Sequence, residues 1–421
     1  MVYTNKVLKH AFLRSVIAAE DDILRRSIHV MYNVKLFNKI SHTAIDNLPA
    51  EHYTCGEDLE TYDAALVRSA KLHDMEFPET LKCIARAGAG VNNIPLERCS
   101  EKGIVVFNTP GANANAVKEL VICALLLASR DIVGGIEWTK SLAGSPDIGP
   151  AAEKGKSQFA GPELSGKKLG VIGLGAIGVK VANVAVSMDM EVWGYDPYLS
   201  VDGALSLSRA VKHITDVNEI FENCDYITVH VPLLDSTRHL INEDSIGRMK
   251  DGVRIINIAR GELVDEDAMC AALACGKVAR YVSDFASEAM LAQRGAIVMP
   301  HLGASTPESE DNCARMAAYS ITEYLEKGTI RNSVNFPNLK VPYEGGYRIS
   351  IIHLNMPNML ASITARLSAK GVNIENMGNR SRGDYAYTII DASHDPTPDE
   401  LSVLRTLPGV ISVRVIREPA M

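Results

Sequence analysis

A glycine-rich segment between two strand-like runs constrains the fold of this chain more than any other feature. Gly173, Gly175 and Gly178 form a Gly-x-Gly-x-x-Gly pattern, which follows the apolar run 168–172. A helical pattern of small apolar residues comes next, and a second strand-like run ends at Asp196. In such a strand–turn–helix–strand unit the first glycine permits the tight turn, the second lets the backbone approach a pyrophosphate, and the third lets helix and strand pack closely. The segment therefore predicts a dinucleotide site, in preference to a structural βαβ unit that binds no ligand.

The same segment favours one cofactor. The start of the helix, at Ala176 and Ile177, presents backbone N–H groups and the positive end of the helix dipole to the phosphates. Asp196 lies 18 residues past Gly178, where a carboxylate accepts a hydrogen bond from a ribose 2′-hydroxyl. Because a carboxylate repels a 2′-phosphate, the sequence predicts NAD and not NADP.

Composition excludes several other classes of protein. The 421 residues are 47% hydrophobic, enough for two or three domains with substantial cores. The net charge of −8 argues against a nucleic-acid partner, and the sequence contains no apolar run long enough to cross a membrane. The eight cysteines are scattered without Cys-x-x-Cys pairing. We expect reduced thiols in a cytoplasmic protein, with neither a disulfide framework nor a metal site.

Alternating strand-like and helix-like runs predict an α/β fold with two doubly wound parallel-sheet domains, one of them of the Rossmann type, and a small α+β domain. The expected parts are an extension at 1–30, a substrate-binding domain at 31–130 and 304–335, a dinucleotide domain at 131–303 and the α+β domain at 346–421. The segment 144–166 is rich in Gly, Pro, Lys and Ser and predicts a loop. Six parallel strands are expected between 168 and 303.

Three polar residues follow predicted strands of the dinucleotide domain. Arg260, Glu288 and His301 each come after an apolar run, and doubly wound folds bind ligands at the carboxyl ends of their strands. A guanidinium binds a carboxylate through two hydrogen bonds. An imidazole takes up a hydroxyl proton near neutral pH, and a neighbouring carboxylate stabilises its protonated form. The three residues together predict a catalytic group, whereas each alone has an ordinary structural explanation.

Several further motifs, taken in chain order, resemble those of the D-isomer-specific 2-hydroxyacid dehydrogenases. The resemblance covers roughly 31 to 421, and its matching segments are Leu66–Ser69, Arg86–Asn93, Asn108–Leu120, Gly173–Gly178, His230–Thr237, Asn257–Glu266 and Pro300–Thr306. It implies that Arg260 orients the substrate and that Glu288 and His301 form a proton relay. At Glu288 the chain departs from the family pattern Asp-Val-Phe-x-x-Glu-Pro, because the segment starting at Asp284 is one residue shorter and lacks the proline.

The resemblance also implies binding residues. Arg68 and Arg86 are expected at the phosphate end of the substrate, unless they are ordinary strand-end arginines in ion pairs. The backbone at Ala89, Gly90 and Val91 is expected near the substrate carboxylate. The remaining cofactor contacts are expected at Pro232, Ala259, Asp284 and Gly303.

The C-terminal segment resembles an ACT domain, a small-molecule sensor, in the stretch 351–360 and at 371–374. By position, His353, Asn355 and Asn373 would bind an effector, with L-serine as the expected one, at a site formed between paired domains. The other interpretation is a domain that only dimerises. Either one implies a homodimer or homotetramer.

The resemblance implies NAD-dependent oxidation of a 2-hydroxy acid, with 3-phospho-D-glycerate as the expected substrate and 3-phosphohydroxypyruvate as the product. Two alternatives stay open. One is the same chemistry on another acid, such as glycerate or lactate, which needs no cations at Arg68 and Arg86. The other is a protein that binds NAD as a sensor without catalysis.

Overall fold

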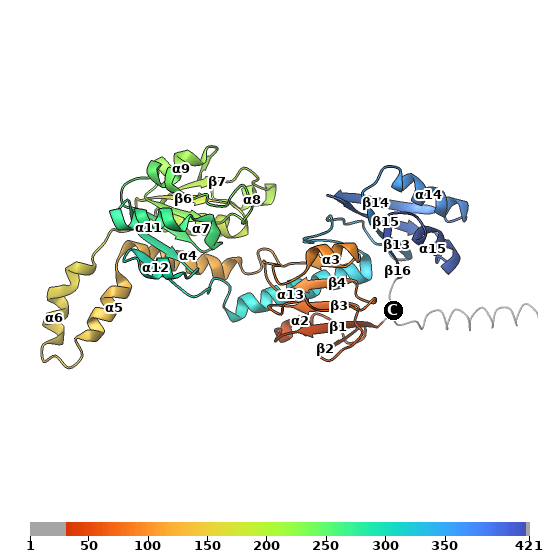
Figure 1. Cartoon of the computed structure of the whole chain (residues 1–421), viewed down its shortest axis with the longest axis horizontal. Helices are drawn as coiled ribbons and strands as arrows, with labels where there is room; N and C mark the ends of the chain where they lie inside the picture. Colours follow the sequence, from red (N-terminus) through yellow and green to blue (C-terminus); the bar gives the residue numbers. More distant parts are fainter. Residues whose placement is uncertain (1–30, 418–421) are drawn as a thin grey trace, which may run out of the picture. The chain divides into compact units, whose positions relative to one another are not determined.

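The computed structural model describes residues 31–417 (Figure 1), so the extension expected at 1–30 lies outside the described residues. Within that range the chain forms two compact units. One contains residues 111–309, and the other contains residues 31–110 together with 310–417. In the described range, no helix combines the length and the apolar character needed to cross a membrane.

The unit 111–309 is built on a seven-stranded parallel sheet with the order β12-β11-β10-β9-β6-β7-β8. Its strands are β6 (Lys168–Ile172), β7 (Glu191–Tyr195), β8 (Lys212–Ile214), β9 (Tyr226–Val229), β10 (Val253–Asn257), β11 (Val278–Ser283) and β12 (Ala296–Val298). The chain runs outward from β6 in one direction and then returns to place β9 on its other side. This is the doubly wound topology, and it places the ligand crevice at the carboxyl ends of β6 and β9. Six strands were predicted; the short β8 was missed.

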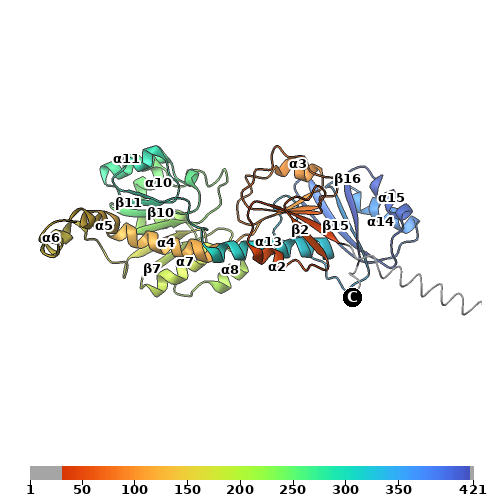
Figure 2. The same cartoon turned by 90° about the horizontal axis from the view of Figure 1, so that it is seen from below.

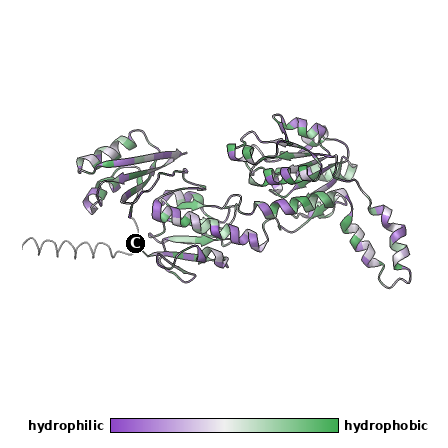
Figure 3. Cartoon of the chain, turned by 180° about the vertical axis from the view of Figure 1, so that it is seen from behind, coloured by the Kyte–Doolittle hydropathy of each residue, from purple (hydrophilic) through white to green (hydrophobic). Residues whose placement is uncertain are grey.

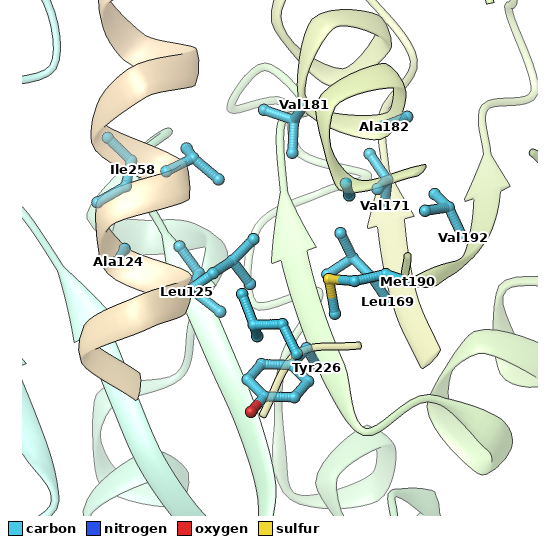
Figure 4. Close-up of a cluster of buried hydrophobic side chains, with 14 of the residues drawn as sticks. Ala124, Leu125, Leu169, Val171, Val181, Ala182, Met190, Val192, Tyr226 and Ile258 are labelled. Carbon is cyan, nitrogen blue, oxygen red and sulfur yellow. The ribbon is translucent and has the colours of Figure 1, made fainter. Parts of the chain in front are cut away.

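Helices cover both faces of this sheet (Figure 2). On one face, α4 (Ala114–Ser129) and α7 (Ala176–Ser187) share a core with β6; Figure 4 shows Leu125, Leu169, Val171 and Val181 meeting there. The other face packs against α9 (Val217–Asn223), α10 (Glu243–Arg248) and α11 (Glu266–Cys275). Because both faces are covered, the central strands are continuous apolar runs of Val, Ile and Leu. Short elements complete the unit: α8 (Val201–Ser206), η2 (Gly261–Leu263) and α12 (Glu288–Leu291).

Two boundary predictions need correction. Helix α4 was expected in the substrate-binding domain, but Val121, Ala124 and Leu125 are fully buried against the sheet of the dinucleotide unit, which begins at Gly111. The expected loop 144–166 is helical between 148 and 159. It contains α6 (Ile148–Gly155) and the short 3-10 helix η1 (Lys156–Phe159), which with α5 (Ile132–Ser141) make an arm that extends from the unit (Figure 1).

The other unit contains a five-stranded parallel sheet, β2-β1-β3-β4-β5. Its elements are β1 (Tyr32–Phe37), α2 (His42–Asp46), β2 (Tyr53–Gly56), β3 (Ala64–Val67), β4 (Cys83–Arg86), α3 (Leu96–Glu101), β5 (Val105–Phe107) and α13 (Pro307–Lys327). Hydrophilic and hydrophobic residues alternate along α13 in Figure 3, whereas α4 is mostly hydrophobic. The alternation along α13 fits a helix that packs against the protein on one side only.

The C-terminal domain is a four-stranded antiparallel sheet with the order β14-β15-β13-β16. Its elements are β13 (Tyr347–Leu354), α14 (Met359–Ala369), β14 (Ile374–Arg382), β15 (Tyr385–Ala392), α15 (Pro398–Arg405) and β16 (Val410–Arg417). The two helices share one core with one face of the sheet, built around Ile349, Ile351 and Ile390. The βαββαβ order fits the expected ACT-like domain.

The opposite face of this small sheet meets the end of α13. Arg348 donates to the carbonyl of Lys327 at 2.8 Å, Tyr387 to that of Gly328 at 2.8 Å, and Arg414 to that of Tyr324 at 2.6 Å. The last carbonyls of a helix have no partners within the helix. The C-terminal domain therefore supplies donors that the end of α13 needs.

Candidate active site

The turn between β6 and α7 has the geometry that a pyrophosphate requires. Gly173 has φ +97°, and a Cβ there would lie 2.8 Å from the His230 carbonyl carbon. A Cβ on Gly178 would lie 1.9 Å from the Gly173 oxygen, which explains the close approach of helix and strand. A Cβ on Gly175 would meet no atom within 4 Å, and no side chain caps the start of α7. The turn thus leaves an open cradle before the amides of Ala176 and Ile177, and this cradle fits a dinucleotide phosphate.

Asp196 lies at the end of β7, beside this cradle. Its two carboxylate oxygens accept hydrogen bonds from the backbone N–H groups of Leu174 at 2.9 Å and Tyr198 at 2.8 Å. These bonds fix the carboxylate next to the glycine turn. The position suits a bond to the adenosine ribose and opposes a phosphate on it.

His230 directly follows β9 and lies against the glycine turn. From the sequence, this residue was assigned no role of its own. Its Nε2 is 3.0 Å from the Thr228 hydroxyl, and its Nδ1 is buried without a partner in the described structure. Burial lowers the pKa of His230 to about 4. The imidazole is therefore neutral at physiological pH. The sequence feature that could have identified His230 is its position two residues before Pro232, where a cofactor contact was expected.

Arg260 follows β10 and is exposed, with its guanidinium Nη1 2.6 Å from the carbonyl of Ala259. A hydrogen bond fixes the turn that carries Arg260: the buried side chain of Asn257 donates to the Arg260 carbonyl at 2.8 Å. The charged end of Arg260 is thus directed by a fixed backbone.

Asp284 and His301 lie at the ends of the next two strands. Asp284 is 2% exposed; one of its carboxylate oxygens accepts from the Gly303 amide at 3.4 Å, and the other is buried without a partner in the described structure. Burial raises the pKa of Asp284, while the charges of His301 and Arg260 and the Gly303 amide oppose that rise. The exposed ring of His301 packs edge-on against Phe285, with centroids 5.0 Å apart. The structure therefore groups Arg260, Asp284 and His301.

Glu288 is not part of this group. It is the exposed first residue of α12, and within residues 31–417 no hydrogen bond or ion pair joins it to His301. The helix begins immediately after Ser287, whose hydroxyl accepts from the Met290 amide at 3.2 Å. The segment from Asp284 is one residue shorter than the family pattern, and the carboxylate whose charge acts on His301 here is that of Asp284.

The expected phosphate residues line a basic pocket of about 530 Å³ at the ends of β3 and β4. Arg68 forms an ion pair with Glu310 at 2.7 Å, and Arg86 donates through Nε to the Arg68 carbonyl at 3.1 Å. Gly88, at φ +152°, makes room for the guanidinium of Arg86, because a Cβ at Gly88 would lie 1.7 Å from Nη1.

The pocket has lining residues that sequence reasoning missed: Ser69, Lys71, His73, Asp74, Asn92 and Asn93. The signal available for two of them was the spacing of basic residues in Arg68-Ser-Ala-Lys71-Leu-His73. The expected substrate contacts at Ala89, Gly90 and Val91 form the loop just before Asn92, and the Ala89 carbonyl accepts from Asn108 at 2.7 Å.

The expected effector residues separate into two places within one chain. His353 is buried, with Nε2 2.8 Å from the Thr388 hydroxyl, and Asn355 is exposed close by, donating to the Gly383 carbonyl at 3.1 Å. Asn373 lies at the other end of the sheet, because Ile374 pairs with Ala392 whereas His353 pairs with Ala386. Six residues along a strand are about 20 Å. One chain alone does not bring the three together.

Two features of this structure fit a nicotinamide dinucleotide: the open cradle at Gly175 and the buried, unpartnered carboxylate oxygen of Asp284, which matches an amide N–H donor. Together with the doubly wound fold and the group at Arg260, Asp284 and His301, they define an NAD-dependent dehydrogenase. The family model for the NAD-binding domain of D-isomer-specific 2-hydroxyacid dehydrogenases matches residues 123–303. The chain belongs to the D-isomer-specific 2-hydroxyacid dehydrogenase family.

Comparison with curated proteins supports this assignment. The chain is 30% identical over 418 residues to the D-3-phosphoglycerate dehydrogenase of Haemophilus influenzae, covering 90% of this chain and 96% of that protein. It is 39% identical over 292 residues to the enzyme of the same name from Methanocaldococcus jannaschii, covering 67% of this chain. That alignment spans only 53% of the archaeal protein, about half its length.

Solved structures agree on the fold. The NAD⁺-bound 3-phosphoglycerate dehydrogenase of Entamoeba histolytica matches with a TM-score of 0.57 and 26% identity, over 73% of this chain and 100% of that one. The D-mandelate dehydrogenase of Rhodotorula graminis matches with a TM-score of 0.61 and 23% identity, over 74% of this chain and 99% of that one. At that identity the second match shows the fold alone.

Proposed function

We propose that this protein oxidises 3-phospho-D-glycerate to 3-phosphohydroxypyruvate with NAD, the first step of L-serine biosynthesis. The observation that carries the proposal is the basic pocket lined by Arg68, Lys71, His73 and Arg86. A phosphate monoester needs cationic hydrogen-bond donors, and arginine supplies them in a fork that matches phosphate oxygens. The names of the relatives from Haemophilus influenzae and Methanocaldococcus jannaschii agree with this substrate.

Each residue of the site has a separate role in the proposed reaction. Arg260 binds the substrate carboxylate through its guanidinium and holds the neighbouring hydroxyl carbon in place. His301 accepts the proton of the substrate hydroxyl. NAD, when bound, would supply the acceptor for the hydride that leaves the same carbon. Asp284 stabilises the imidazolium that results, because its carboxylate already acts on His301. Glu288 would take the relay role expected from the family only if the start of α12 moved toward His301.

One feature favours the alternative of a different 2-hydroxy acid. Glu310 pairs with Arg68 at 2.7 Å and neutralises part of the positive charge of the pocket. A short acid without a phosphate, such as glycerate, would then need no free cation there. 3-Phosphoglycerate and glycerate differ only at the end that carries the phosphate. The substrate preference of the wild-type enzyme therefore tests the two proposals directly.

The deciding experiment follows NADH formation at 340 nm with NAD and either 3-phosphoglycerate or D-glycerate, with and without L-serine. We expect turnover with the phosphorylated acid and little with glycerate. Turnover with glycerate or another 2-hydroxy acid, and none with 3-phosphoglycerate, would replace the proposal with the alternative substrate.

We further propose a homodimer or homotetramer. Helices α5 and α6 have no buried residues, and Ile132, Val133, Ile136 and Ile148 are exposed on them. Exposed apolar side chains on a projecting arm suit a second copy of the chain. Sedimentation velocity of wild type and of Ile136→Asp measures this, with a shift of the variant toward monomer expected.

We propose that L-serine regulates the enzyme at a site formed in the same assembly. Because His353 and Asn373 lie at opposite ends of one sheet, the proposed effector site combines His353 and Asn355 with Asn373 of the partner subunit. The edge strand β14 is largely exposed, as an edge that pairs with another chain would be. We place the protein in the cytoplasm, where the eight free thiols of this chain would stay reduced.

A further inference from the structure

Three polar side chains are buried in β10 and β11, the strands that lead to Arg260 and Asp284. Asn257 and Ser283 are fully buried and Tyr281 is 4% exposed. They lie on neighbouring strands, because β10 pairs with β11 in a register that sets Asn257 beside Ser283 and Ile255 beside Tyr281. A buried polar group destabilises the fold unless it is hydrogen-bonded. We call Asn257, Tyr281 and Ser283 the strand-end network.

On the β10 side the network shapes the turn that presents Arg260. The Asn257 Nδ2 donates to the Arg260 carbonyl at 2.8 Å, and its Oδ1 accepts from the Ala259 amide at 3.2 Å. A single side chain thus closes the turn between the end of the strand and the arginine.

On the β11 side the network reaches the loop under His301. The Asn257 Nδ2 donates to the Tyr281 hydroxyl at 3.3 Å. Ser283 Oγ accepts from the Phe285 amide at 3.2 Å. Phe285 is the ring that packs against His301. Because Asn257 and Ser283 are partners in the register of β10 and β11, the strand pairing and the hydrogen bonds at each end connect the two turns that carry the reacting groups.

We propose that Asn257, with Tyr281 and Ser283, is a positioning unit that sets the distance and orientation of Arg260 relative to His301. The three residues act through the backbone of Ala259, Arg260 and Phe285, so they are positioning residues. The inference rests on the proposed role of Arg260 in binding the substrate carboxylate. A small misplacement of a binding group is enough to lower turnover strongly without affecting the cofactor.

The test is a double-mutant cycle between Asn257→Ala and Arg260→Ala, read as kcat/KM for the hydroxy acid together with the Kd for NAD. In the native background Asn257→Ala is expected to lower kcat/KM by about 30-fold or more, with the Kd for NAD changed less than about twofold. In the Arg260→Ala background the same change is expected to lower it less than about twofold, because no guanidinium is left to position. Equal losses in both backgrounds, or a matching loss of NAD affinity, would overturn the proposal and leave a structural role.

A milder variant keeps the test decisive if Asn257→Ala does not fold. Tyr281→Phe retains the ring and removes one hydrogen bond, and is expected to lower kcat/KM by about three- to tenfold. Its matched control is Tyr226→Phe, another fully buried tyrosine of the same sheet, whose hydroxyl is 2.8 Å from Ser129. The control is expected to keep the wild-type kcat/KM; equal values for the two variants would overturn the proposal.

The assay uses whichever 2-hydroxy acid the wild-type enzyme oxidises. If that acid is not 3-phosphoglycerate, the proposed function fails, while the cycle still reports on the strand-end network. If 3-phosphoglycerate is oxidised and the cycle is additive, only the positioning proposal fails.

Discussion

The guanidinium of Arg348 and the carboxylate of Asp391 form a two-point ion pair in the C-terminal domain, with Nε and Nη2 donating to separate oxygens at 2.6 and 2.9 Å. Arg348 is fully buried, and its remaining donors reach the carbonyls of Lys327, Val341 and Pro342. One side chain thus joins the sheet of the C-terminal domain to the end of α13 and to the linker between them.

We expect Arg348→Met to lower the free energy of unfolding of this region by about 3 kcal/mol, because it leaves a partly buried carboxylate and helix carbonyls without their donor. Hydrogen exchange of β13 and the last turn of α13 measures this. The matched control is Arg417→Met, which breaks the exposed Arg417–Asp395 pair and should change stability by less than about 1 kcal/mol. Equal exchange in the two variants would contradict the account of Arg348.

The carboxylate of Asp196 gives a prediction about cofactor choice. Asp196→Asn keeps the size of the side chain and an acceptor for a backbone amide but removes the charge that opposes a 2′-phosphate. We expect the ratio of kcat/KM with NADP to that with NAD to rise by about tenfold or more. The control is Asp202→Asn, an exposed residue of α8. The prediction fails if Asp196→Asn loses activity with both cofactors in the same proportion.

His230 gives a prediction about pH. The pKa of His230 falls from 6.5 to about 4 on folding. Between these two pH values the unfolded chain binds a proton at His230 and the folded chain does not. The stability that His230 contributes is fully present above pH 6.5 and is lost as the pH falls toward 4, by up to about 3 kcal/mol.

Both tryptophans, Trp138 and Trp193, lie in the dinucleotide unit, so urea denaturation followed by their fluorescence reports on the part that contains His230. We expect His230→Asn to lose less stability than wild type between pH 7 and pH 5. Parallel curves for the two proteins would show that another group causes the loss.

Much of the site was predictable because its residues sit where strands end, and strand ends are visible as the last residues of apolar runs. Arg260 and His301 were predicted in this way, together with Glu288, whereas Asp284 was expected only from the family resemblance, as a cofactor contact. The glycine turn was predictable for a related reason, since its whole Gly-x-Gly-x-x-Gly pattern lies within the short segment 173–178.

The errors arise where the outcome depends on distant partners. The apolar face of α4 was plain in the sequence, but nothing local indicates which of two sheets will cover it. The separation of His353 from Asn373 within one chain likewise depends on strand register, which places Ile374 beside Ala392; it does not contradict the effector site expected between paired domains. The strand-end network was invisible for the same reason, because Asn257 and Tyr281 meet only through the pairing of β10 with β11.

The ion pair between Arg68 and Glu310 leads to the prediction that best separates the candidate substrates. A charge-assisted hydrogen bond contributes about 1.5–3 kcal/mol. Arg68→Met should therefore raise KM for 3-phosphoglycerate by about 10- to 100-fold, while any residual activity with D-glycerate stays unchanged.

The paired control is Glu310→Gln, which removes the competing carboxylate and leaves the guanidinium in place. Because Glu310 competes with a phosphate for Arg68, we expect this variant to bind 3-phosphoglycerate at least as tightly as wild type. Steady-state kinetics with both acids measures the two effects. If Arg68→Met weakened both acids equally, Arg68 would serve the fold of the pocket through its ion pair, and the phosphate would have to bind through Lys71, His73 or Arg86 instead.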